Sequence, residues 1–199
     1  QLAEFYLMEK RFSDFDRLMT ESRQAIPGTP LWHQLQARRW SMEGRQSRVI
    51  DELTQAYELD SSLTTLWPLS NALLEADQPE RVLSLLRQWG PQMQKYPQLK
   101  ALQARAMATA GQPEQARQLF MQAFDLAQNN PTQIDSVLRQ SRRALPANQV
   151  IAMVAPRVAE DASGFYGLVH ARLLAQNPQR TDEALQQLEQ LKQRLAESA

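Results

Sequence analysis

The sequence predicts an all-α protein made of antiparallel helix pairs, because apolar residues, a tripeptide and turn residues all recur at related intervals. Small or apolar residues near the start of the expected second helices follow one another after 34, 33, 34, 34 and 34 positions. Another apolar residue lies four positions after each of them. Such a pair marks the buried face of a helix. The pairs are Phe15 with Met19, Val49 with Leu53, Val82 with Leu86, Ala116 with Phe120, Val150 with Val154, and Ala184 with Leu188.

The expected first helices carry an independent repeat signal. The tripeptide Gln-Ala-Arg at 36–38 and 103–105, and His-Ala-Arg at 170–172, are spaced by 67 and 67 residues, or two intervals. Turn residues then separate the two helices of a pair. Glycine can adopt a left-handed backbone after a helix, and proline is tolerated at the first position of the next one. We therefore expect helix-turn-helix joints at 43–46, 76–80, 110–114 and 177–180.

The composition excludes several classes of protein. Of the 199 residues 43% are hydrophobic and 22% are charged, and only six are glycine, which favours a folded helical chain over a disordered tail. Lys plus Arg and Asp plus Glu both total 22, so no net charge attracts the chain to nucleic acid. There is no cysteine, which excludes disulfides and thiolate metal sites. No apolar run approaches the roughly 18 to 20 residues that a membrane span needs.

The sequence contains no pattern typical of a catalytic or metal site. The two histidines, His33 and His170, each lack a second histidine or carboxylate four positions on, the spacing that makes a metal pair on a helix. The glycine motifs of hydrolases, nucleotide-binding proteins and dinucleotide-binding proteins do not occur. The paired acids at 160–161 and 182–183 suit helix termini. We therefore expect no enzyme activity, no catalytic residues, no metal and no cofactor.

The repeat resembles the tetratricopeptide repeat, a 34-residue pair of antiparallel helices. The second expected unit is the most similar, with Ala37 and Trp40 on the first helix, Gly44 in the turn, and Leu53 and Ala56 on the second helix. The fourth unit is similar through Ala104, Gly111, Ala116, Phe120 and Ala123. The resemblance implies a right-handed α-solenoid, a superhelix that forms a single array over residues 1–199. Its approximate repeats are 1–29, 30–62, 63–96, 97–130, 131–163 and 164–199.

Several residues depart from the family pattern. Trp89 and Arg157 stand where the family has a small residue on the second helix, and Ala-Leu-Pro-Ala-Asn at 144–148 replaces a glycine-containing turn. The leucines of residues 181–199 share one face, which either caps the array or continues into another helix. They are Leu185, Leu188, Leu191 and Leu195. Trp40 and Trp89 occupy positions of the apolar stripe, so we expect them in the core. Most methionines are expected to fill space in the core as well. The methionines are Met8, Met19, Met42, Met93, Met107, Met121 and Met153.

In this family the first helices line a concave groove, so residues there that the core does not use are candidates for partner binding. One such position, just after the small residue of the first helix, recurs from the second unit to the sixth. Its residues are Arg38, Asn71, Arg105, Arg139 and Arg172. Arg142, one turn after Arg139, extends the row together with Arg143. A guanidinium group pairs bidentately with carboxylates, so the row suits an acidic peptide segment.

Each of these residues also has a structural interpretation. The arginines could each pair with an acidic residue of the adjacent repeat. Asn71 matches an asparagine of family members that grip a terminal carboxylate, but the lysines of that clamp are absent here. Trp67 is a groove candidate because aromatic residues dominate binding hot spots, and the alternative is packing against the preceding unit. Pro68 is expected in the first turn of a helix that starts near Thr65.

The leading hypothesis is a non-enzymatic scaffold or adaptor that binds a protein or peptide, acidic by preference, in its concave groove. It predicts no binding of nucleic acid and no membrane insertion by this segment. The amphipathic start at residues 1–11 leads us to expect a fragment of a longer protein. The low-lysine composition resembles bacterial proteins, in which such arrays serve secretion, pilus or polysaccharide-export assemblies. That resemblance favours the periplasm or cell envelope, with the cytoplasm as the alternative. Other hypotheses are a structural spacer or self-association module, and a glycan-binding solenoid of an exporter.

Overall fold

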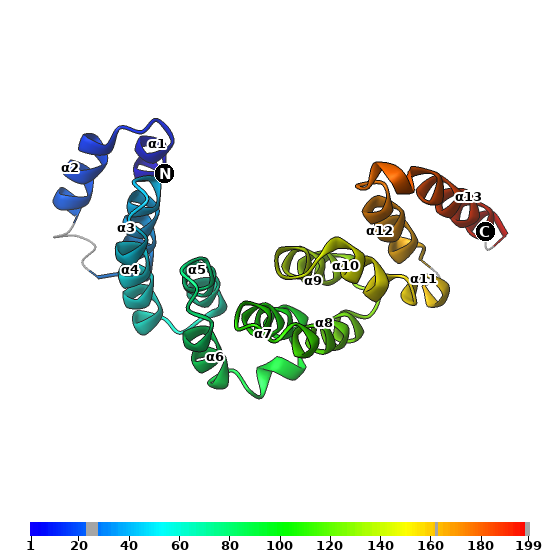
Figure 1. The fold of residues 1–199 in the computed structure, drawn as a ribbon. Helices are drawn as coiled ribbons and strands as arrows, with labels where there is room; N and C mark the ends of the chain where they lie inside the picture. Colours follow the sequence, from blue (N-terminus) through cyan, green and yellow to red (C-terminus); the bar gives the residue numbers. More distant parts are fainter. Residues whose placement is uncertain (23–27, 162, 198–199) are drawn as a thin grey trace. The chain divides into compact units, whose positions relative to one another are not determined.

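The computed structural model describes residues 1–22, 28–161 and 163–197, and every regular element in these ranges is helical (Figure 1). The predicted all-α class is therefore confirmed. Residues 23–27, 162 and 198–199, which belong to the first, fifth and sixth expected repeats, lie outside the described residues. None of the helices in the described ranges combines the length and the apolar character needed to cross a membrane. The chain forms two compact units, Gln1–Val82 and Leu83–Ala199.

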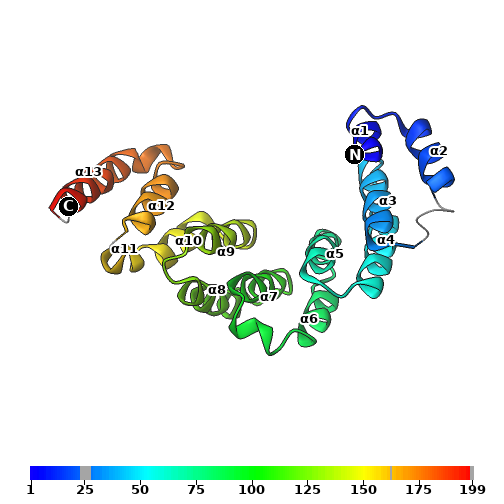
Figure 2. The same cartoon turned by 180° about the vertical axis from the view of Figure 1, so that it is seen from behind.

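The first unit is built from helix pairs. Its helices are α1 (Leu2–Met8), α2 (Phe12–Ser22), α3 (Pro30–Met42), α4 (Gln46–Leu59), α5 (Leu63–Glu75) and the start of α6 (Pro79–Arg87). Helix α1 packs against α2 and α3, and α4 packs against α3 and α5. The pairing of α3 with α4 is visible from both sides (Figures 1 and 2). Thr29 caps α3, because its hydroxyl accepts a hydrogen bond from the Trp32 amide at 3.2 Å.

The second unit continues with helices that pack on their neighbours in the chain. They are η1 (Gln92–Gln94), α7 (Pro97–Thr109), α8 (Pro113–Ala127), α9 (Pro131–Ala144), α10 (Ala147–Val154), α11 (Arg157–Glu160), α12 (Phe165–Leu174), η2 (Pro178–Arg180) and α13 (Thr181–Glu197). Helix α7 packs along α8 and α9, α10 packs against α12, and α12 pairs with α13. One apolar core, which includes Phe120, Val150 and Leu173, runs through α7 to α13.

The turns between paired helices share one backbone conformation. Lys10, Gly44, Asp77 and Gly111 have φ angles of 54°, 70°, 56° and 75°, so the described chain repeats a left-handed residue after 34, 33 and 34 positions. This confirms the expected left-handed glycines of 43–46 and 110–114. A Cβ atom at Gly44 or Gly111 would meet nothing within 4 Å. Glycine is favoured there by its backbone freedom and not by lack of space.

The helix pair α9–α10 departs from this pattern. The sequence predicted this, because residues 144–148 replace a glycine-containing turn. Leu145 has an extended backbone, with φ −129° and ψ 151°, and α10 starts two residues later at Ala147. Helix α10 then ends at Val154, just before Pro156, and α11 resumes at Arg157. Proline has no amide hydrogen and its ring clashes with the preceding turn, so it interrupts the second helix.

The predicted apolar stripe is buried except at its last position. Its buried members are Phe15, Met19, Val49, Leu53, Val82, Leu86, Ala116, Phe120, Val150, Val154 and Ala184. Leu188 is 40% exposed, so its prediction is wrong. On α13, Leu191 faces α12. A Cβ atom at Gly164 would lie 2.9 Å from the Leu191 side chain, and a Cβ atom at Gly167 would lie 3.1 Å from it. Leu185 and Leu188 are exposed, because they lie off this close contact. Leu195 is partly exposed although a Cβ atom at Gly164 would lie 3.4 Å from it.

Some predicted core residues lie nearer the surface. Trp40 is half-buried, because it sits in the last turn of α3 beneath the guanidinium groups of Arg45 and Arg48, 5.2 and 4.6 Å from its ring centre. Trp89 is also half-buried, since α6 ends at Arg87 and the stripe does not reach it. The core interpretation is wrong for three exposed methionines, two at the ends of helices and one beside a stripe residue. They are Met8, Met42 and Met121.

Candidate partner-binding grooves

A groove between α9 and α12 brings together two of the predicted binding residues, Arg139 and Arg172. Its cavity has a volume of about 450 Å³. The side chains that line it come from the first helices of two successive pairs. They are Pro131, Thr132, Asp135, Leu138, Arg139, Phe165, Leu168, Val169 and Arg172. The structure thus places two guanidinium groups beside one mainly apolar hollow.

Local capping fixes the start of both helices at this groove. Asn130 caps α9, because its side-chain oxygen accepts a hydrogen bond from the Gln133 amide at 3.1 Å. Before α12, Gly164 has a left-handed φ of 76°. An Asp161 carboxylate oxygen accepts a hydrogen bond from the Tyr166 amide at 2.7 Å. These contacts set the direction in which α9 and α12 present their groove residues.

The groove has an apolar floor and an excess of positive charge. Leu138 and Val169 belong to the buried core, whereas Leu168 is 53% exposed and available to a ligand. Arg139 forms an ion pair with Asp135, four residues earlier on the same helix. Arg172 is exposed and has no ion-pair partner among the described residues. Two arginines and one aspartate line the groove, so a carboxylate would be attracted to it.

A second groove, between α3 and α5, brings together Arg38 and Asn71. Its cavity of about 330 Å³ is lined by Gln34, Ala37, Arg38, Ser41, Val49, Leu53, Pro68, Asn71, Ala72 and Glu75. The single arginine here faces two glutamates, because Glu75 lies in the lining and Arg38 is 3.8 Å from Glu4 of α1. The Asn71 side-chain amide donates a hydrogen bond to the Trp67 carbonyl at 2.9 Å. This groove therefore has less attraction for an anion than the α9–α12 groove.

Pro68 lies inside α5 and not in its first turn, because the helix begins at Leu63 and not near Thr65. Proline removes the amide that would bond to the Thr64 carbonyl. In its place the Gln34 side chain, from α3, donates a long hydrogen bond of 3.5 Å to that carbonyl. Trp67 is half-buried and is not among the described residues that line the α3–α5 cavity.

The remaining predicted residues make contacts within the protein. Arg105 is only 8% exposed, and its guanidinium donates a hydrogen bond from α7 to the Gln140 side chain of α9 at 3.3 Å. Arg142 is exposed and donates to the Gln176 side chain, just beyond α12, at 3.1 Å. The partner of each contact lies roughly one repeat further along the chain, but it is a glutamine and not the acidic residue that the structural interpretation of the arginine row expected.

Sequence reasoning missed the apolar part of the α9–α12 groove and the aspartate in it. The sequence did indicate the contact of Asp135, because Asp135 lies four positions before Arg139, which is the spacing of an ion pair on a helix. Leu168 likewise lies four positions before Arg172 and so shares its side of α12. Its exposure had no signal in the sequence, since a leucine in an amphipathic helix is normally expected to be buried.

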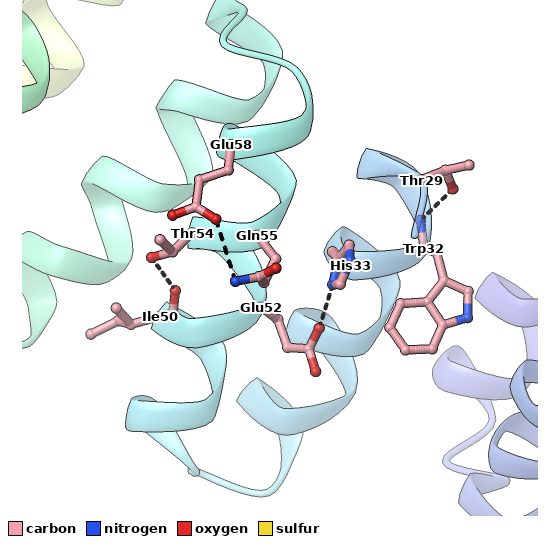
Figure 3. A network of polar contacts seen from close by, with 8 residues as sticks. All are labelled: Thr29, Trp32, His33, Ile50, Glu52, Thr54, Gln55 and Glu58. Carbon is pink, nitrogen blue, oxygen red and sulfur yellow. Dashed lines mark hydrogen bonds and ion pairs between the residues drawn. The ribbon is translucent and has the colours of Figure 1, made fainter. Parts of the chain in front are cut away.

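His33 belongs to a polar contact that joins α3 to α4. Its Nδ1 atom lies 2.7 Å from a carboxylate oxygen of Glu52, and Figure 3 shows the two side chains pointing toward one another. The Trp32 ring meets the His33 ring edge-on, with centres 5.0 Å apart. No group of three or more acidic or histidine side chains that could hold a metal ion occurs in the described ranges. The geometry of His33 and Glu52 suits a link between the two helices.

A cavity of about 340 Å³ beside α8 and α11 has Arg157 among the residues that line it. The Arg157 guanidinium donates to the Met153 carbonyl at 2.6 Å and to the Met121 carbonyl at 3.0 Å, and it pairs with Asp125. Burial raises the pKa of the Tyr166 hydroxyl, which also lines this cavity, to about 12. The arginine that departs from the family pattern thus ties α10 and α11 back to α8.

His170, on α12, is expected to make the stability of the protein depend on pH. Its Nδ1 atom is buried and has no hydrogen-bond partner among the described residues. Burial lowers its pKa below the ordinary value of 6.5, although a hydrogen bond with Gln187 acts in the opposite direction. Just below pH 6.5 the unfolded chain therefore binds more protons at this residue than the folded chain. The stabilising effect of the neutral imidazole is present above that pH and is lost as the pH falls.

We expect the free energy of unfolding to fall as the pH decreases from about 6.5, and the fall to be smaller in His170→Gln. Urea denaturation of both proteins across this range measures the two slopes. A reference measurement at pH near 8, where the imidazole is neutral in both states, corrects for any loss caused by the substitution itself. Equal slopes for wild type and variant would show that His170 is not the group responsible.

Comparison with known proteins does not assign this chain to a family. No protein-family model matches it, and no curated protein matches it significantly. The functional interpretation therefore depends on the two grooves, on the charges that line them and on the repeated helix pairs.

Proposed function

We propose that this chain is a non-enzymatic scaffold that binds a segment of another protein along its first helices. We also propose that its helix pairs stack as a right-handed solenoid of the tetratricopeptide type. The α9–α12 groove carries the functional proposal, because it combines an exposed apolar side chain with two guanidinium groups. The left-handed turn that recurs at 34, 33 and 34 residues supports the solenoid.

The two kinds of groove residue have different roles in such binding. Covering a large apolar side chain such as Leu168 stabilises a complex by up to about 1.5 to 3 kcal/mol. An exposed arginine–carboxylate pair contributes less, typically about 0.2 to 1 kcal/mol, but selects which segment binds and in which register. On this basis apolar contact supplies most of the affinity, and the arginines supply most of the specificity.

Selection from a displayed library of short random peptides on the immobilised protein tests the proposal. We expect peptides to be enriched, and their binding to be lost in the double variant Leu168→Ser with Arg172→Gln. The matched control is Leu185→Ser with Arg117→Gln, which removes a leucine of similar exposure from α13 and a solvent-facing arginine from α8. A library that yields no binder, or binders that the control variant loses equally, would contradict the proposal.

Self-association is the second candidate, and the exposed leucines of α13 favour it. On the last helix described, Leu185 is 60% exposed, Leu188 40% and Leu195 39%. Two copies could cover these leucines against one another. Analytical ultracentrifugation distinguishes the candidates: a dimer that forms with increasing concentration and is lost in Leu185→Ser with Leu188→Ser favours self-association. A monomer at every concentration rules it out.

A further inference from the structure

We infer that the segment bound between α9 and α12 carries a carboxylate about 6 Å from a large apolar side chain, and that Arg172 recognises the carboxylate. The inference rests on the proposed function and specifies the chemistry of its partner. It commits to one occupant, an acidic–apolar segment of another protein. The argument for that occupant is charge complementarity together with the order of residues along α12.

Arg172 is the groove cation that is available to an incoming anion. Arg139 already pairs with Asp135 on its own helix, so a ligand carboxylate would have to compete with that aspartate. Arg172 is exposed and has no carboxylate partner in the described ranges. A guanidinium group offers two parallel N–H donors to one carboxylate, a geometry that an amide or a hydroxyl does not match.

The order of residues on α12 sets the spacing in the ligand. Phe165, Leu168 and Arg172 follow one another at three and four positions and so lie along one side of the helix. Leu168 and Arg172 are therefore about 6 Å apart along the axis, at about 1.5 Å per residue. Side chains two positions apart in an extended segment, at about 3.3 Å per residue, match this distance. So do side chains four positions apart in a helical segment.

The α3–α5 groove lacks this combination. Glu75 lines it together with Arg38, and Glu4 lies 3.8 Å from the same guanidinium. A carboxylate entering there would meet two negatively charged groups and one positively charged group. We therefore assign the acidic segment to the α9–α12 groove and not to both grooves.

The peptides selected on the wild-type protein provide the probe. We expect an aspartate or glutamate at a constant separation, two or four positions, from a leucine, isoleucine or phenylalanine. Replacing that acid with its amide should weaken binding by up to about fivefold. Arg172→Gln should weaken the binding of the acidic peptide by a similar factor and leave the binding of the amide peptide unchanged. Asp135→Asn should tighten binding, because it releases Arg139. Arg117→Gln serves as the charge-matched control and should have no effect.

The outcomes separate this inference from the proposed function. Two results would overturn the inference and leave the scaffold proposal standing. One is a set of enriched peptides that share no acidic residue. The other is an acidic residue whose replacement weakens binding equally to wild type and to Arg172→Gln. Binding that depends on Arg38 would do the same, whereas a library without any binder would reject both. Arg172→Glu with a lysine in place of the peptide acid should restore binding. Thermal melting by circular dichroism verifies that each variant folds.

Discussion

Replacing Phe120 with alanine lowers the free energy of unfolding by about 3 to 5 kcal/mol, the range for loss of a fully buried phenylalanine ring. Phe120 has 0% of its surface exposed and belongs to the core that α7 to α13 share. The substitution removes the ring and leaves a cavity that close-packed neighbours can fill only in part. Urea denaturation followed by circular dichroism measures the change.

The adjacent residue provides a control on the same turn of α8. Met121 is 38% exposed, so Met121→Ala should cost less than about 1 kcal/mol. Comparable losses for both variants would mean that α8 does not face the core as described. Leu138 and Val169 belong to this core and also line the α9–α12 groove. Peptide binding by Phe120→Ala should therefore fall in parallel with the folded fraction of the protein.

Arg157→Ala should lower the free energy of unfolding by about 2 to 3 kcal/mol, a large effect for an arginine. The side chain is 14% exposed, donates to two backbone carbonyls, pairs with Asp125, and lies 5.4 Å from the centre of the Phe124 ring. Alanine would leave the carbonyls of Met121 and Met153 without this donor. It would also remove the connection across the interruption at Pro156.

Asp125→Asn separates the carbonyl contacts from the ion pair. The Asp125 side chain is 69% exposed, so its substitution should cost less than about 1 kcal/mol. Amide hydrogen exchange should show faster opening of α10 and α11 in Arg157→Ala and little change in Asp125→Asn. If both variants lost the same stability, the ion pair and not the carbonyl contacts would be the main contribution of Arg157.

Part of the candidate site could be predicted from the sequence. The register of the first helices identified Arg139 and Arg172, and the structure places both at one groove. The same register selected Arg105, which is buried against Gln140, a residue 35 positions further along the chain. Helical periodicity gives the direction of a side chain from its own helix. It does not tell whether a neighbouring helix covers that direction.

The sequence by itself determined the helical class and the left-handed turns at Gly44 and Gly111. These features depend on local physics, namely the spacing of apolar residues around a helix and the backbone freedom of glycine. Only the tertiary structure decided that Leu168 and Leu188 are exposed and that Arg105 is buried. Exposure depends on contacts between helices from different pairs, and the amphipathic pattern is the same whether such a contact forms or not.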